Sequence, residues 1–217
     1  MSVRKNKINY VEYKIKNINK EFFVYAREEL YNIVEEYVDL LAKELKDCPV
    51  LIYEKQNLVE KYEGDAFSLP WYGREDTFDM DEDNIIAQIL QKKFEIETKK
   101  SIYIIVLYKS VFSSKIKCIY CILHEIRHIQ QFAFDDNVHE VILEIMESSD
   151  GEQYLDLPFE IDAVIYAKEK LIEAGFNYDE IAKFFKSRYS KRSEIIMKEP
   201  IRELKDVVKD IQDYCCG

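Results

Sequence analysis

The hydrophobic pattern divides the chain into a first part with strand-like segments and a second part that is mainly helical. Over residues 20–47, apolar side chains recur every three or four positions, which predicts an amphipathic helix. Residues 48–55 (CPVLIYEK) and 101–109 (SIYIIVLYK) are instead runs of β-branched and aromatic residues. We expect two strands there, and because the second is nearly all apolar, we expect it to be buried at the centre of a sheet.

The segment between these two strands has a different composition. Residues 64–83 contain two of the five glycines, one proline and the only tryptophan, which predicts an irregular loop or an edge strand. A flap that faces a substrate would lie here. The following residues, up to Glu97, predict a helix whose first amides are capped by Asp83 or Asn84.

The second part of the chain predicts helices alone. The expected helices cover residues 115–132, 138–146, 158–174, 178–191 and 199–214. Ser113 or Ser114 can cap the helix over 115–132. The helix over 158–174 has proline in its first turn and Gly175 just past its end, as helix termini favour. Strands followed by helices indicate an α+β fold. We expect a single domain over 1–217, with a helix and strand part to about residue 110 and a helical part from about 111.

Composition excludes several classes of partner. The 217 residues are 47% hydrophobic, enough for one sizeable core, and the net charge of -11 is spread along the chain, so we expect no nucleic acid partner. No apolar run of about 18 residues is present, and none follows the basic N-terminus, which argues against a membrane span or a secretory leader. Five cysteines without framework spacing fit a reducing compartment. We therefore predict a cytoplasmic protein.

Two of the three histidines suggest a metal site. His124 and His128 lie four residues apart in the helix expected over 115–132, and Glu125 directly follows the first. Residues four apart share one helix face, so both imidazoles can bind one ion, while Glu125 lies about 100° around the helix, within reach of a metal-bound water. Isoleucines supply a separate apolar face that would anchor the helix, at 119, 122, 126 and 129. This is the geometry that a hydrolytic zinc enzyme needs.

A catalytic zinc takes three protein ligands and keeps one position open, so a third ligand is required. The candidates after the motif are His139, Glu140, Glu144, Glu147, Glu152, Glu160 and Asp162. We favour Glu160, because it begins a largely apolar helix in which a buried carboxylate needs a cation. The alternative is a first-turn glutamate stabilised by the helix dipole. Asp162 is then either a substitute ligand or an acceptor that orients a histidine ring through its other nitrogen.

These two segments resemble a known group of enzymes. HEIRH at 124–128, followed by PFEIDAVIYA at 158–167, is similar to the gluzincins, the zincin metallopeptidases whose third ligand is glutamate, and in particular to small single-domain peptidases of bacteria and phages. The resemblance covers roughly residues 100–170. It implies a zincin-like fold with a short mixed sheet and an active-site helix, a zinc ion on His124, His128 and Glu160, and Glu125 as the general base.

The same resemblance stops short of a substrate. The chain lacks the Asn-Glu-x-x-Ser-Asp signature of thermolysin-like enzymes and the third histidine of metzincins. The expected function is zinc-dependent hydrolysis of a peptide or protein substrate by a metal-activated water. Two alternatives stay open: a non-catalytic zinc-binding regulatory or interaction protein with a zincin-like fold, and a helical scaffold without metal.

Weaker signals accompany the motif. Cys118 and Cys121 are a possible soft-ligand pair, but with His124 and His128 they lie along one continuous helix and cannot surround an ion, so buried thiols are the better interpretation. The donor to the tetrahedral oxyanion stays unassigned among Tyr72, Tyr154, Tyr166 and Arg127.

Overall fold

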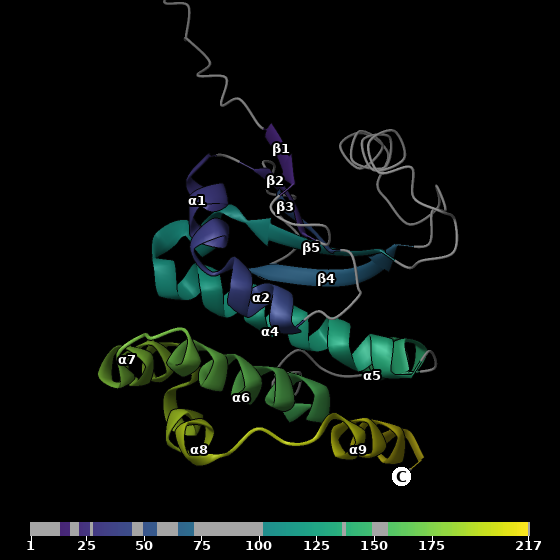
Figure 1. Cartoon of the computed structure of the whole chain (residues 1–217). Helices are drawn as coiled ribbons and strands as arrows, with labels where there is room; N and C mark the ends of the chain where they lie inside the picture. The colour runs from purple at the N-terminus through teal and green to yellow at the C-terminus, as the bar shows by residue number, and fades with distance from the viewer. Residues whose placement is uncertain are drawn as a thin grey trace, which may run out of the picture.

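A mixed sheet and a set of stacked helices form the α+β architecture of this computed structural model, which describes residues 14–17, 22–26, 28–44, 50–55, 65–71, 102–135, 138–148 and 156–216. In Figure 1 the sheet lies at the top, helices α4 and α5 run beneath it, α6 and α7 lie below α4, and α8 and α9 are at the bottom. The helical part of the chain is thus layered onto one side of the sheet, with α4 as the layer between sheet and helices.

The sheet is five-stranded and mixed. Its strands are β1 (Lys14–Asn17), β2 (Phe22–Ala26), β3 (Val50–Lys55), β4 (Ala66–Trp71) and β5 (Ile102–Tyr108), in the order β1-β2-β3-β5-β4. The pairs β2/β3 and β3/β5 are parallel, and the outer pairs β1/β2 and β4/β5 are antiparallel. Ile52 of β3 pairs with Ile105 of β5, and both side chains are fully buried. The strands predicted from the apolar runs near residues 50 and 105 are therefore confirmed.

One sequence prediction is wrong at its start. The helix expected over 20–47 begins only at Glu28, and the residues before it, FFVYA, form β2. Four consecutive β-prone residues favour a strand, and the alternation of a strand also buries Val24 and Ala26 on one face. Two shorter helices follow, α1 (Glu28–Glu36) and α2 (Val38–Glu44). Strand β1 was not predicted.

The segment predicted as a loop or edge strand contains an edge strand. Within residues 64–83, β4 occupies Ala66–Trp71 and ends the strand order. Residues 72–83, the remainder of the segment in which a flap was expected, lie outside the described residues, as does the helix predicted to follow that segment.

The predicted helices of the second part are present, with small shifts in their ends. They are α4 (Lys115–Phe134), α5 (Val138–Ser148), α6 (Pro158–Glu173), α7 (Tyr178–Tyr189) and α9 (Leu204–Cys216), with a short 3-10 turn η2 (Lys109–Ser113) before α4. Ser114 caps α4 by accepting from the amide of Lys117 at 3.3 Å, and Gly175 ends α6 with φ 86°. The turn η4 (Ser190–Arg192) and helix α8 (Ser193–Lys198) were not predicted, and α9 starts later than expected.

Helix α4 holds the centre of the core. Four of its five isoleucines, at 119, 122, 126 and 129, have no exposed surface and pack in one cluster with β3 and β5 on one side and α6 and α7 on the other. Because α4 is enclosed on several sides, even its polar residues are largely buried. None of the described helices combines the length and apolar character needed to cross a membrane.

Candidate metal centre

Three side chains from two helices converge on one point. His124 and His128 project from α4, and Glu160 projects from the first turn of α6. The Nε2 atoms of the two histidines are 3.1 Å apart. Glu160 places Oε2 3.3 Å from Nε2 of His124 and Oε1 3.2 Å from Nε2 of His128. Among the described residues, this is the group of histidine, cysteine and acidic side chains that could hold a metal ion.

The separations between these atoms fit a metal ion well. Zinc with bonds of about 2.0–2.1 Å in a tetrahedron places its ligand atoms about 3.3–3.4 Å apart. The two Nε2 atoms are 3.1 Å apart, and each lies 3.2–3.3 Å from one of the two oxygens of Glu160, so these separations are close to the edge length of such a tetrahedron. Two nitrogens and one carboxylate oxygen also form a donor set that zinc accepts. The residues therefore suit a metal ion with a fourth position left for another ligand.

His128 is held in one orientation by the residue one turn further along α4. Its Nδ1 lies 2.9 Å from Oε1 of Gln131. The amide nitrogen of Gln131 donates to the carbonyl of Phe159 at 3.1 Å and to Asp162 at 2.9 Å. Since these two bonds assign the amide nitrogen, Oε1 must accept from His128, which puts the proton on Nδ1 and the lone pair on Nε2. This is the tautomer that a metal ligand requires.

Asp162 contacts His128 only indirectly, through Gln131. Its carboxylate accepts from Nε of Arg127 at 2.7 Å and from Nη2 at 3.2 Å, and the side chains of this pair are only 2% and 6% exposed. It also accepts from Gln131, which in turn holds His128. Asp162 was expected either as a ligand or as the acceptor on a histidine ring, but Gln131 is that acceptor for His128, and Asp162 accepts from Gln131 instead.

The charges of the group depend on one another. Burial lowers the pKa of His128, but the carboxylate of Glu160 offsets this and raises that pKa to about 9. Burial raises the pKa of Glu160, yet the two histidines bring it well below its usual range. Without a metal, the group would therefore hold a proton between carboxylate and imidazole. A metal ion would replace that proton.

Glu125 lies in the same cleft as the three converging side chains. The cleft has a volume of about 210 Å³ and is walled by β4, α4, α6 and the end of α7. Glu125 is 5% exposed, and no hydrogen bond or ion pair reaches its carboxylate from any other residue that the structure describes. A buried carboxylate without such a partner is costly unless a proton, a cation or a polar ligand accompanies it.

The other candidate ligands lie elsewhere or outside the described residues. Glu140 and Glu144 are exposed on α5, and the side chains of His139, Glu147 and Glu152 are not described. Cys118 and Cys121 are free, buried thiols, as the sequence indicated, and burial raises the pKa of Cys118 to about 12. Thiols that stay protonated are poor metal ligands.

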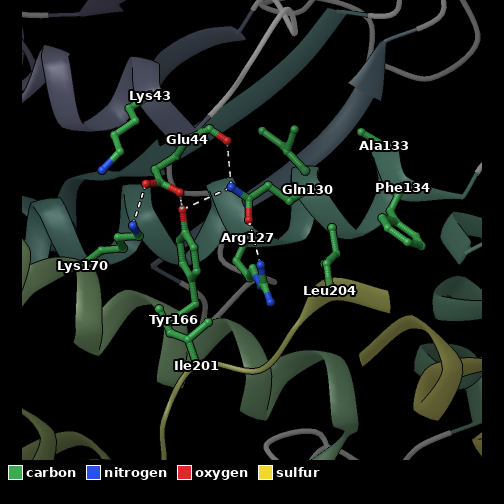
Figure 2. Close-up of a pocket in the computed structure, with 11 residues that line it drawn as sticks. Lys43, Glu44, Arg127, Gln130, Ala133, Phe134, Tyr166, Lys170, Ile201 and Leu204 are labelled. Atoms are coloured by element: carbon green, nitrogen blue, oxygen red, sulfur yellow. Dashed lines mark hydrogen bonds and ion pairs between the residues drawn. The ribbon is translucent and has the colours of Figure 1, made fainter. Parts of the chain in front are cut away.

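A second cavity lies on another side of α4, and none of the three converging side chains lines it (Figure 2). It has a volume of about 600 Å³ and is lined by residues of α2, α4 and α6 and by the chain leading into α9. Tyr166 donates to Glu44 at 2.8 Å, and Gln130 donates to the Glu44 carbonyl at 2.7 Å and to Tyr166 at 3.2 Å. Two suggested oxyanion donors, Tyr166 and Arg127, belong to this cavity and not to the cleft with Glu125. The other two, Tyr72 and Tyr154, lie outside the described residues.

No family model matches the chain, and no similar protein was found among curated proteins or among solved structures.

Proposed function

We propose that this protein is a zinc-dependent peptidase with a zincin-like active site. The observation that carries the proposal is the convergence of His124, His128 and Glu160 at 3.1–3.3 Å in a cleft that also contains the buried carboxylate of Glu125. Three ligands supplied by the protein and a nearby carboxylate with no described partner are what metal-assisted hydrolysis requires.

Zinc fits this donor set better than the hard cations. Calcium and magnesium prefer six or more oxygen ligands, whereas two imidazoles and one carboxylate suit zinc. When bound, zinc would polarise a carbonyl and lower the pKa of a coordinated water to about 7. The tautomer that Gln131 imposes on His128 keeps Nε2 available for such an ion.

Glu125 is the group that would move the proton. Its carboxylate is buried next to the two histidines and is the acidic side chain of the cleft that is neither one of the three converging groups nor paired with a cation, in contrast to Asp65. In the proposed reaction it accepts the proton of the attacking water and passes it to the nitrogen of the leaving amine. The peptide bond then breaks with no net change in the protonation of Glu125.

Strand β4, which lines the cleft, supports a peptide as the substrate. Ala66, Phe67 and Ser68 of β4 line the cleft, and β4 ends the sheet among the described strands. An extended peptide can pair with such an edge and place its backbone alongside the catalytic group. Phe67 is 37% exposed there, which offers an apolar contact to a substrate side chain.

The test begins with the metal content of protein purified without a histidine tag or chelator and then dialysed against trace zinc. We expect about one zinc per chain by mass spectrometry. The zinc-loaded protein is then incubated with a peptide library, beside Glu125→Gln and a control, Glu140→Gln, which changes an exposed glutamate of α5. Glu125→Gln should keep its zinc and lose about 10²–10⁴-fold in rate, whereas the control should cleave as the wild type does.

Two results would count against the proposal. Cleavage that survives Glu125→Gln would remove the general base from the mechanism. Stoichiometric zinc without cleavage of any peptide would favour the alternative function, a zinc-binding regulatory or interaction protein.

A further inference from the structure

Two tyrosine hydroxyls form a chain that starts at His124. The Tyr120 hydroxyl lies 3.5 Å from Nδ1 of His124, on the side of the ring away from the metal group. The same hydroxyl is hydrogen-bonded to the hydroxyl of Tyr189, the last residue of α7. Arg188 donates from Nε to the Tyr189 oxygen at 3.3 Å.

Counting donors and acceptors gives this chain a direction. With a metal on Nε2 of His124, the ring proton must be on Nδ1, so the Tyr120 oxygen accepts from the imidazole. The Tyr120 proton is then donated to Tyr189. Tyr189 already accepts from Arg188 and Tyr120, so its own O–H has no acceptor among the described residues. If Tyr189 donated to Tyr120 instead, the hydroxyl proton of Tyr120 would have no acceptor at a residue that is only 1% exposed. That costs more free energy than leaving the hydroxyl proton of Tyr189 without an acceptor at the wall of the cleft.

Tyr189 is held rigidly at the wall of the cleft. Its ring stacks on Phe185 with centroids 5.7 Å apart, and the guanidinium of Arg188 lies 5.8 Å from the centre of its ring. Arg188 forms an ion pair at 2.5 Å with Asp65, the residue that directly precedes β4. The next residue, Ser190, has φ 46°, a strained conformation for a residue other than glycine that persists only where the surrounding structure imposes it. The chain thus holds the tyrosine in place at the end of its helix.

The cleft places this hydroxyl beside the reacting groups. Tyr189 lines the same cleft as His124, Glu125 and Glu160. Burial is the main cause that raises the pKa of Tyr189, and the charge of Glu160 adds to it, so the hydroxyl keeps its proton at neutral pH and is a donor.

We propose that Tyr189 donates a hydrogen bond to the oxyanion that forms when water attacks the substrate carbonyl. This inference rests on the proposed peptidase function. The hydroxyl donates without losing its proton: the proton of the attacking water goes to Glu125 and then to the leaving amine, while Tyr189 stabilises the negative oxygen. A fixed donor in a partly buried cleft is effective because it needs no reorganisation as the charge develops.

The test compares Tyr189→Phe with a control on the same helix, Tyr178→Phe, whose ring is 55% exposed. The first measurement is the affinity of the zinc-loaded proteins for phenylphosphonate, a tetrahedral oxyanion, by calorimetry. A hydrogen bond to a charged group is worth about 1.5–3 kcal/mol, so Tyr189→Phe should weaken binding by about 10- to 100-fold. Tyr178→Phe should bind as the wild type does. Zinc affinity should be unchanged in both variants.

Any cleaved peptide gives a second readout. Tyr189→Phe should then lower kcat by about 10²–10³-fold and leave KM nearly unchanged, as expected for a contact made in the transition state. Equal phenylphosphonate affinity in Tyr189→Phe and the wild type would overturn the inference. So would a loss of zinc affinity in parallel with the phenylphosphonate loss, because Tyr189 would then act only by supporting His124 through Tyr120.

The outcome for Tyr189 can be separated from that for the peptidase proposal. Phenylphosphonate binding that depends on Tyr189, without cleavage of any peptide, supports the oxyanion site and rejects peptides as its substrate. Cleavage that needs Glu125 but not Tyr189 supports the peptidase proposal and rejects Tyr189 as the donor to the oxyanion.

Discussion

Two buried polar clusters lie between α4 and α6, and they balance their charges in opposite ways. The metal cluster consists of His124, His128 and Glu160, and the ion-pair cluster consists of Arg127 and Asp162. Arg127 meets both oxygens of Asp162 and also donates to the carbonyl of Arg202 at 3.1 Å and to Gln130 at 3.0 Å. In the ion-pair cluster every contact joins a donor to an acceptor, so the protein's own groups balance the buried charges without an added ion.

The metal cluster lacks this balance. The two imidazole nitrogens are 3.1 Å apart, each lies 3.2–3.3 Å from one oxygen of Glu160, and all of these atoms can present a lone pair, so only a proton or a cation between them makes the arrangement favourable. The two clusters alternate along the same helices, with Arg127 next to His128 and Asp162 two residues after Glu160. Burial of charge therefore does not identify a functional site. The informative feature is a set of buried ligand atoms that the chain leaves for something else to complete.

The largest expected effect tests the ion-pair cluster. Asp162→Ala leaves the guanidinium of Arg127 buried without its counter-charge, and removing one partner of such a pair costs about 3–5 kcal/mol. We expect the free energy of unfolding to fall by this amount in urea titrations, in chelator as well as in zinc. Asp156→Ala breaks the exposed pair with Arg192, so the loss there should be less than about 1 kcal/mol.

A double variant sharpens this test. Replacing both members, Arg127→Met with Asp162→Leu, removes the uncompensated charge and should recover most of the lost stability. If the single and double variants were equally destabilised, packing of Asp162 and not its charge would be what matters.

The metal cluster was predictable because its geometry is mostly local. The spacing of His124 and His128 is set by the turn of one helix, and Glu160 was distinguished by its apolar helix, in which it is indeed 3% exposed. The role of Gln131 could have been inferred as well, because a residue three positions after His128 lies on the same helix face.

Other contacts had no local signal. Asp162 was expected against a histidine, but it pairs with Arg127, 35 residues earlier in the chain, because the packing of α6 on α4 decides which side chains meet. Tyr189 meets Tyr120 across 69 residues, from a helix whose own pattern showed only amphipathicity. Strand β2 was missed because its apolar residues also fit a helical spacing, and pairing with β3 decided between the two.

A smaller effect, on zinc affinity, should distinguish the neighbouring glutamines Gln130 and Gln131. Gln131→Leu removes the acceptor that holds Nδ1 of His128, and losing such a partner costs about 10- to 100-fold in metal affinity. Gln130→Leu makes the same chemical change one residue earlier but removes bonds to Glu44 and Tyr166 of the second cavity. We expect zinc affinity, measured by competition with a chromophoric chelator, to drop only for Gln131→Leu. Similar losses in both variants would mean that general destabilisation of α4, not orientation of His128, weakens the site.

The smallest effect concerns the proton that occupies the metal cluster in the absence of metal. The folded-state pKa of His128, about 9, is above its ordinary value of 6.5, so the pair with Glu160 stabilises the metal-free protein below pH 6.5, and this contribution is lost as pH rises through about 9. Zinc needs the neutral imidazole, so its apparent affinity should rise about tenfold per pH unit until the pH reaches that pKa. Competition titrations from pH 6.5 to 9.5 measure this slope.

The cause of this slope can be isolated in the metal-free protein. In Glu160→Gln burial still lowers the pKa of His128, while the largest charge that raises it is gone and only the weaker effects of Glu125 and Gln131 remain, so that pKa should fall well below 9 in an NMR titration of the imidazole. A wild-type pKa near 6.5, with zinc affinity flat between pH 7 and 9, would show that the buried carboxylate does not hold a proton on His128. The metal cluster would then resemble the ion-pair cluster in being complete without an added cation, and the contrast between the two would fail.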